Sequence, residues 1–215
     1  GQSALGHSTP GKAPPVVQPP RNTHAVKPKA PAGKAAAAGA AAGAAAGAAA
    51  GAAAPPVTPP PAPAPEKPDP AKGSVTGQPL PRWAALRTDE VNLRTGPGTR
   101  YPVEWVYRRR DLPVLIEREF EVWRLIRDQD GVKGWVHQAT LTGRRSFMVK
   151  SRDTTLRRSA ADDAGAVAVL KPGVVGRIRS CDATGAWCDV QVADYRGWLK
   201  RDAMWGLLPG EAVSN

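Results

Sequence analysis

The fold is decided by one stretch of sequence, Trp123-Arg124-Leu125-Ile126-Arg127-Asp128-Gln129-Asp130-Gly131-Val132-Lys133-Gly134-Trp135-Val136. Its first five residues have the aromatic and β-branched content of a strand. Asp130-Gly131 supplies two residues that adopt the positive-φ conformations of a tight turn at low cost. Gly134-Trp135-Val136 then returns as the partner strand, so the stretch predicts a β-hairpin.

The hairpin has a second copy downstream, which indicates a tandem duplication. Trp135 is matched by Trp198, 63 positions later (198 − 135), and Trp123 is matched by Trp187, 64 positions later (187 − 123). The difference of one position indicates a single inserted residue. Each copy has the length of a small five-stranded barrel, so we expect an all-β chain with two tandem small β-barrels.

The chain before residue 83 is expected to lie outside both barrels. All seven tryptophans lie from Trp83 onward, as do all tyrosines and phenylalanines. Without large apolar side chains, a segment cannot bury enough area to offset the entropy lost on ordering. We therefore predict a disordered Pro/Ala/Lys/Gly arm at residues 1–82, a first barrel at 83–143, a second and degenerate barrel at 144–206, and a tail at 207–215.

Within the arm, residues 35–54 form an Ala/Gly tract with a glycine at every fourth position from Gly39 to Gly51. Small residues four apart suit close helix packing in a membrane, and the tract is long enough to span one. Alanine is only marginally apolar, so a low-complexity spacer is the preferred interpretation over membrane contact. The proline-dense residues 55–70 are expected to run as extended polyproline II.

The formal net charge of +11 favours anionic partners such as nucleic acid, acidic wall polymers or lipid headgroups. The first 82 residues hold eight Lys or Arg against Glu66 and Asp69, a balance of +6 that leaves +5 (11 − 6) for the folded part. The simpler alternative is that this charge serves solubility and loose electrostatic attraction.

A family resemblance is carried by Val91-Asn92-Leu93-Arg94-Thr95-Gly96-Pro97-Gly98, Tyr101-Pro102, Trp123 and Gly134-Trp135-Val136. Together they resemble a bacterial SH3-like domain, of the kind found in exported proteins of Alphaproteobacteria. The resemblance covers about residues 85–206 in two copies, and in the second copy residues 158–163 replace the Gly-Pro-Gly loop. It implies small bent β-barrels in the cell envelope that bind peptidoglycan or short peptides and have no catalysis of their own.

The setting and the cysteines fit this resemblance. The chain begins at Gly1 rather than at Met, as a periplasmic or secreted product would after removal of its signal peptide, although any other trimmed boundary would look the same. In an exported chain, Cys181 and Cys188 are expected to form a local disulfide, with two buried thiols as the alternative. A loop this short gains about 2–3 kcal/mol from the bond.

No enzyme, metal or cofactor is expected. A catalytic Cys–His pair would have to join His137 to a cysteine of the other copy, and the chain lacks clustered metal ligands. The proline of Gly96-Pro97-Gly98 removes a backbone donor that a phosphate-binding loop would need. Glu117, Glu119 and Glu121 alternate along the sequence, which indicates a solvated strand face.

The candidate ligand-binding residues are Tyr101, Trp105, Trp123, Arg109 and Arg110. If Ile126 faces the barrel interior, Trp123 faces outward, where it could form a peptide-binding groove with Tyr101 and Trp105. The alternative for these aromatic residues is that they seal a barrel end.

Three further tryptophans, Trp135, Trp187 and Trp198, are expected in the cores. Arg109 and Arg110, with Arg108, could meet carboxylates of wall peptides or phosphates, or could simply be solvated turn residues.

These features predict a non-enzymatic envelope module whose first barrel binds a peptidoglycan stem peptide or a partner-protein segment. Two alternatives stay open. The first is a nucleic-acid-binding protein that uses the basic arm, which the sparse lysines make the weaker choice. The second is a structural subunit that assembles with other envelope components.

Overall fold

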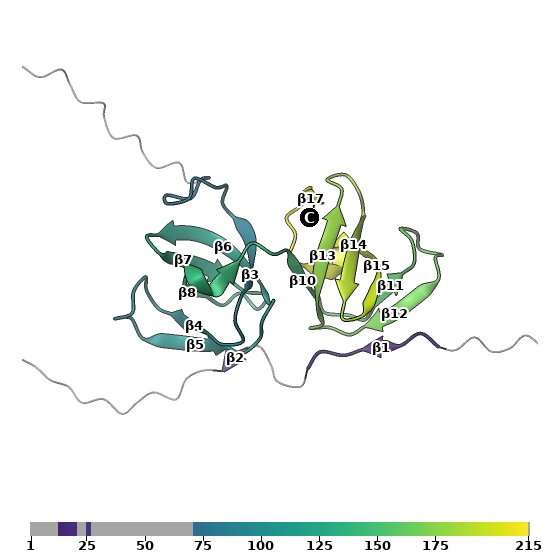
Figure 1. Ribbon diagram of the computed structural model, residues 1–215, viewed down its shortest axis with the longest axis horizontal. Coiled ribbons are helices and arrows are strands. Elements are labelled where there is room, and N and C mark those ends of the chain that lie inside the picture. The colour runs from purple at the N-terminus through teal and green to yellow at the C-terminus, as the bar shows by residue number, and fades with distance from the viewer. Residues whose placement is uncertain (1–12, 21–24, 27–70, 215) are drawn as a thin grey trace, which may run out of the picture. The chain divides into compact units, whose positions relative to one another are not determined.

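The computed structural model describes residues 13–20, 25–26 and 71–214, which form two β-barrels and two short strands that pair with them (Figure 1). The predicted all-β fold with two tandem SH3-like barrels is confirmed. The first sheet contains β2 (Ala25–Val26), β3 (Arg82–Leu86), β4 (Val91–Arg94), β5 (Val103–Tyr107), β6 (Pro113–Phe120), β7 (Trp123–Arg127), β8 (Lys133–His137) and β9 (Leu141–Thr142). The second contains β1 (Val16–Val17), β10 (Ser146–Val149), β11 (Thr154–Arg157), β12 (Ala166–Leu170), β13 (Val175–Cys181), β14 (Trp187–Val192), β15 (Tyr195–Lys200), β16 (Met204–Trp205) and β17 (Val213–Ser214).

The two barrels repeat the same strand order, as the duplication predicts. The first runs β2-β5-β4-β8-β7-β6-β3-β9 and the second β1-β12-β11-β15-β14-β13-β10-β16, with β17 paired to β13. A 3₁₀ turn follows the hairpin in each copy, at Gln138–Thr140 and at Arg201–Ala203.

The opening hairpin forms as predicted, with β7 and β8 joined by a turn at residues 128–132. Gly131 adopts a φ of 83°, and the buried carboxylate of Asp128 accepts hydrogen bonds from the amides of Asp130 and Val132 at 3.0 and 2.8 Å. The Tyr107 hydroxyl donates to the same carboxylate at 2.9 Å. Asp128 thus ties the turn to β5, a strand that does not pair with this hairpin.

Each hairpin contains one glycine where two strands approach closely. A Cβ atom built on Gly134 would lie 2.9 Å from the carbonyl oxygen of Arg94, and one built on Gly197 would lie 2.4 Å from that of Arg157. Only glycine fits at these positions, which explains why Gly-Trp occurs in both copies.

Glu119 departs from the expected solvated face, because its side chain is fully buried. A bulge between Ile116 and Arg118 shifts the register, so Glu119 lies opposite Arg124. The Glu119 carboxylate accepts hydrogen bonds from the amides of Val75 and Thr76 at 3.0 and 2.9 Å, from the Thr76 hydroxyl at 2.7 Å and from Arg82 at 2.6 Å.

Burial alone would raise the pKa of Glu119, but the hydrogen bonds from Thr76, Arg82 and Val75 outweigh it and lower the pKa to about 2. The carboxylate therefore remains ionised in the folded protein, where it holds the chain segment that precedes the first barrel.

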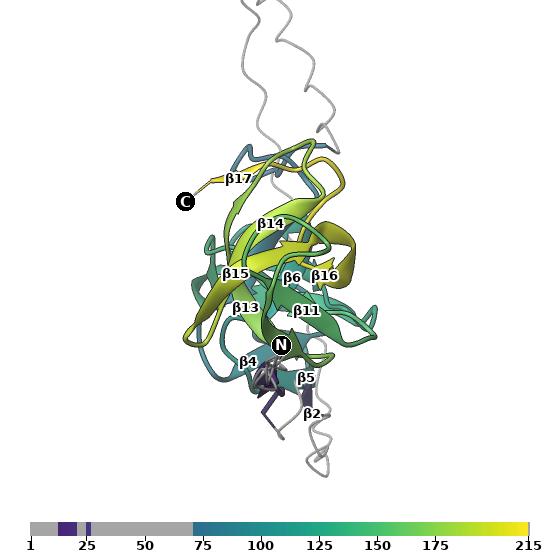
Figure 2. The ribbon, with the colours of Figure 1, turned by 90° about the vertical axis from the view of Figure 1, so that its right-hand side faces the viewer.

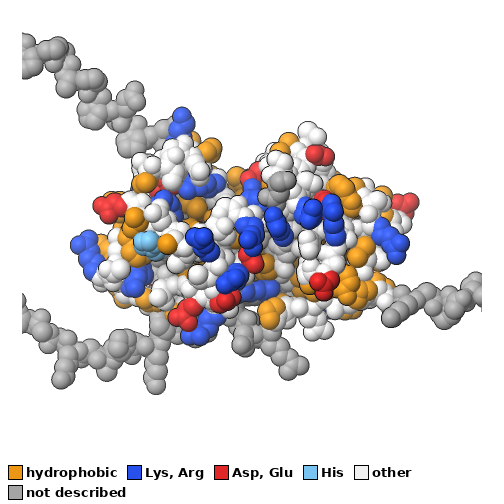
Figure 3. Space-filling view, viewed as in Figure 1, with side chains coloured by type: hydrophobic (Ala, Val, Ile, Leu, Met, Phe, Trp, Pro, Cys, Tyr) orange, Lys and Arg blue, Asp and Glu red, His pale blue; other side chains and the backbone are white. Residues whose placement is uncertain are grey.

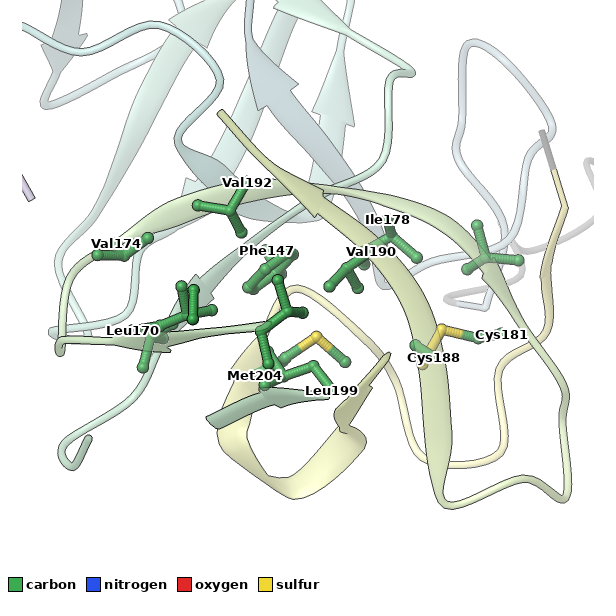
Figure 4. Close-up of a cluster of buried hydrophobic side chains, with 14 residues drawn as sticks. Phe147, Leu170, Val174, Ile178, Cys181, Cys188, Val190, Val192, Leu199 and Met204 are labelled. Atoms are coloured by element: carbon green, nitrogen blue, oxygen red, sulfur yellow. A yellow bond between two sulfur atoms is a disulfide. The ribbon is translucent and has the colours of Figure 1, made fainter. Parts of the chain in front are cut away.

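The disulfide between Cys181 and Cys188 is present, and it joins paired residues of β13 and β14 with Cα atoms 4.5 Å apart. A bulge between Ile178 and Ser180 places Cys181 on the core side. Both cysteines belong to the buried cluster of the second barrel, where they lie at one end next to Ile178 and Val190 (Figure 4).

The boundaries of the barrels differ from the predicted ones in two places. Residues 71–82 were expected to be disordered, but residues 71–81 form an ordered turn region and Arg82 begins β3. The turn is held at Glu119, whose carboxylate accepts hydrogen bonds from the Val75 and Thr76 amides. The tail, which contains β17 (Figure 2), is also part of the second barrel. β17 pairs with β13, and Val213 is buried in the core cluster.

Two pieces of the arm also depart from the expectation. Residues 13–20 and 25–26 provide strands β1 and β2, each paired with an edge strand of a barrel. The predicted Ala/Gly tract at 35–54 and the proline-dense stretch at 55–70 lie outside the described residues. Within the part of the chain that is described, no helix is long and apolar enough to cross a membrane.

Replacing Glu119 by Gln should destabilise the first barrel by about 1–3 kcal/mol at neutral pH, because charge-assisted hydrogen bonds to two amides, a hydroxyl and an arginine are weakened. The pKa of Glu119 is lower in the folded state than in the unfolded state, so its ionised form stabilises the fold at pH values above the ordinary pKa of a glutamate. That stabilisation is lost as the pH falls toward about 2. The difference between wild type and Glu119→Gln in urea denaturation should therefore shrink between about pH 4.5 and pH 2. Glu104→Gln, at an exposed position, is the control and should change little.

Candidate functional site

Tyr101 belongs to a loop that its own ring helps to shape. A Cβ on Gly96 would lie 2.6 Å from the tyrosine ring and one on Gly98 3.3 Å from it, so the ring covers both glycines. The guanidinium of Arg94 donates to the Tyr101 carbonyl at 2.7 Å, and Arg100 lies 5.0 Å above the ring. In the second copy Arg157 donates in the same way to the carbonyl of Ala164, which shows that the clamp persists without the tyrosine.

The predicted aromatic groove does not form as expected, because Trp105 and Trp123 have other roles. Trp105 packs against the core cluster of the first barrel. Trp123 is only 7% exposed and lies in a cross-strand row between Phe120 and His137, with its ring edge-on to the imidazole at 5.4 Å. It faces away from Ile126, as predicted, but it is covered by its neighbours on that outer face.

The expected core positions of Trp135, Trp187 and Trp198 are wrong. All three side chains are half-buried, and none belongs to a core cluster. The residues next to them in the strands, such as Val136 and Leu199, are fully buried, and alternation therefore turns the tryptophans outward. The Lys200 amine lies 5.3 Å from the Trp187 ring, as expected for a surface aromatic residue.

Arg109 and Arg110 line a cleft with a volume of about 360 Å³, which we call the arginine cleft. Its other lining residues come from the turn before β6, the connection after β9, the start of β10, and β13 and β14 or their ends. The full lining is Arg109, Arg110, Asp111, Arg144, Ser146, Val175, Gly176, Arg177, Gln191 and Ala193. None of the three predicted aromatic residues is among them, so the structure separates the two parts of the predicted site.

Four arginines and one aspartate line the cleft, which gives it a formal charge of +3 (4 − 1). The aspartate, Asp111, pairs at 3.8 Å with Arg144, and this exposed pair neutralises little of the local potential. Arg177 is exposed, and its side chain forms no ion pair among the described residues. Figure 3 shows how Lys and Arg side chains gather across one face of the molecule.

Arg109 and Arg110 differ in their contacts and exposure. The Arg109 guanidinium donates to the carbonyl of Gly173 at 2.8 Å, and burial lowers its pKa. Arg110 is more than half exposed, and its contact among the described residues is an ion pair with Asp89 at 3.5 Å. The Arg109 side chain therefore helps to hold the fold through its hydrogen bond to Gly173. The exposed side chains of Arg110 and Arg177 are accessible to an anionic ligand.

Arg144 and Arg177 were missed by the sequence prediction. They lie 34 and 67 positions after Arg110 (144 − 110, 177 − 110), and no motif connects them. Only the folded chain brings their strands and loops to one cleft.

Replacing Trp123 by Ala should destabilise the first barrel by about 3 kcal/mol, because a buried indole is removed from its row on the sheet. The measurement is the denaturation midpoint of the full chain followed by far-UV circular dichroism. Trp135→Ala removes a half-buried ring from the adjacent strand and should cost clearly less. Equal losses for the two variants would contradict the buried position of Trp123.

The chain is similar to one protein family and to several solved structures. The family described as bacterial SH3 domain matches residues 87–143 and 150–206. Structures of NlpC2 and NlpC1 from Trichomonas vaginalis are each 14% identical to this chain, with TM-scores of 0.27 and 0.28. The matches cover 58% and 62% of this chain and 48% of each of those chains, so this chain spans about half of their length. No curated protein matches the chain.

Proposed function

Because the chain belongs to the bacterial SH3 domain family, we propose that it is a non-enzymatic binding module of the cell envelope whose arginine cleft binds carboxylates of peptidoglycan stem peptides. The observation that carries this proposal is the excess of four arginines over one aspartate in a single cleft.

Guanidinium groups suit this ligand because their planar fork matches a carboxylate with two parallel hydrogen bonds. Arg110 and Arg177 have exposed side chains for such contacts. A stem peptide offers carboxylates on a short extended chain, so two arginines of one cleft could engage it together. An acidic segment of a partner protein has the same chemistry and is the second candidate ligand.

The chemistry of the other groups supports a binding role. Both cysteines are held in a disulfide, and neither therefore supplies a thiolate nucleophile. The Nδ1 atom of His137 accepts the amide of Ala139 at 3.1 Å and caps the 3₁₀ turn. The imidazole has a structural function in this position.

Charge reversal in the arginine cleft should weaken binding of a soluble stem peptide by at least about tenfold, because two favourable charge interactions become repulsive. The measurement is calorimetric titration of the full chain and of Arg110→Glu/Arg177→Glu with a synthetic stem peptide. Arg118→Glu, an exposed arginine on β6 outside the cleft, is the matched control and should bind like wild type.

Unchanged binding by the cleft variant would overturn the proposal. A DNA oligonucleotide serves as the rival ligand. Binding of DNA that is stronger than that of the stem peptide and falls steeply with salt would favour the nucleic-acid alternative.

An envelope location predicts that Cys181 and Cys188 are oxidised in the living cell, because cytosolic thiols are kept reduced. Cells are quenched with an alkylating reagent, and the peptides that contain the two cysteines are measured by mass spectrometry. We expect a linked pair in nearly all molecules. Alkylated cysteines throughout would contradict an oxidising compartment.

A further inference from the structure

The segment at residues 13–20, Ala-Pro-Pro-Val-Val-Gln-Pro-Pro, pairs with the edge of the second barrel. Its strand β1 lies parallel to β12, with Val16 opposite Val169 and Val17 opposite Leu170 (Figure 1). The Val169 amide donates to the carbonyl of Pro15 at 2.9 Å, and the Lys171 amide donates to that of Val17 at 3.0 Å. The segment thus completes backbone hydrogen bonds that the edge strand would otherwise leave open.

Side chains add a second set of contacts at this edge. Val17 is half-buried against the core cluster of the second barrel, whereas Val16 is 53% exposed. Pro14 and Pro15 line a groove of about 660 Å³, opposite the barrel residues Arg158, Ala166, Val167 and Tyr195. Tyr195 and Val167 themselves pack on the core. The edge therefore buries the Val17 face of the segment and leaves the Val16 face exposed. Tyr195 provides an aromatic surface in the groove that Pro14 and Pro15 line.

The prolines limit how strongly the segment is held. Proline lacks an N–H group, so Pro15 contributes only its carbonyl, and Pro19 and Pro20 cannot continue the ladder as donors. The paired strand is two residues long as a result. So short a strand can be replaced by another peptide, since only a few hydrogen bonds and one buried valine hold it at the edge of β12.

The equivalent edge of the first barrel is also paired. β5 precedes β12 by 63 positions (166 − 103), and it pairs with β2 of the same N-terminal arm. β2 runs antiparallel to β5, whereas β1 runs parallel to β12. The same edge strand therefore accepts an added segment in both copies, although the direction of that segment differs.

We propose that the edge of β12, together with Arg158, Val167 and Tyr195, is a binding site for extended apolar peptides flanked by prolines. Residues 14–18 of the same chain are its built-in ligand, and they compete with peptides of the same kind from other proteins. This mode is strand addition, in which backbone hydrogen bonds give affinity and alternate side chains give specificity. It uses the second barrel and does not depend on the arginine cleft.

The probe is the fluorescently labelled peptide Ala-Pro-Pro-Val-Val-Gln-Pro-Pro, titrated into full-length chains and followed by anisotropy. Val17→Asp should release the internal segment, because a carboxylate replaces the valine that packs on the core. The variant should bind the probe at least about tenfold more tightly than wild type, since the tethered competitor is lost. Val16→Asp, which changes the exposed neighbour, is the matched control and should bind like wild type.

Two further measurements keep the proposal falsifiable. In hydrogen exchange, the Val169 and Lys171 amides should exchange faster in Val17→Asp than in wild type, and the probe should restore their protection. Adding Val169→Pro to Val17→Asp removes the donor that faces β1 and should abolish probe binding. Arg110→Glu/Arg177→Glu should leave probe binding unchanged, which separates this site from the arginine cleft.

Equal probe affinity for wild type, Val16→Asp and Val17→Asp would overturn the proposal, as would probe binding that survives Val169→Pro. A wild-type dimer in sedimentation that dissociates on Val17→Asp would overturn the intramolecular assignment, because the segment would then occupy the edge of a second copy.

Discussion

Each barrel depends on one cross-strand pair, placed just after the bulge in its longest hairpin. In the first barrel the pair is Glu119 and Arg124, and in the second it is Cys181 and Cys188. Both pairs are buried, yet one is an ion pair with a separation of 3.7 Å and the other is a covalent bond. The duplicated fold therefore fixes the position of a strong link between the two strands, while the chemistry of the link is free to differ.

The chemistry of the pair determines what covers that end of each barrel. A buried carboxylate must find enough donors, and Glu119 obtains them from Arg82 and from the backbone of residues 75–76, which orders the chain before the first barrel. A disulfide needs no hydrogen-bond partners. The corresponding end of the second barrel is covered instead by β17, whose Val213 lies opposite Cys181 and is buried. The ion pair recruits the preceding chain, and the disulfide leaves room for an apolar strand from the following chain.

The local signals in the sequence predicted the barrels, the turn at Asp130-Gly131 and the disulfide, because each depends on neighbouring residues or on the repeat. The side-chain faces were harder to predict. The alternation of side chains along a strand correctly placed Trp123 and Ile126 on different faces of the sheet. An outward residue can still be buried, as Trp123 is between its cross-strand neighbours Phe120 and His137. Glu119 looked like one of three alternating surface acids, and only the bulge turned it inward. The arginine cleft required the folded chain, since Arg110 and Arg177 share no local pattern.

The arm illustrates the difference between forming a core and pairing with an edge. Composition correctly indicates that residues 13–20 cannot bury much apolar area, yet a two-residue strand needs only available carbonyls and one side chain that fits. A duplicated barrel has two equivalent edge strands, β5 and β12, and unpaired edges favour association with other chains. A proline-flanked segment covers such an edge without extending it, because proline offers no donor to a further strand. The same property that keeps the arm from folding alone makes it a suitable and replaceable cover for β12.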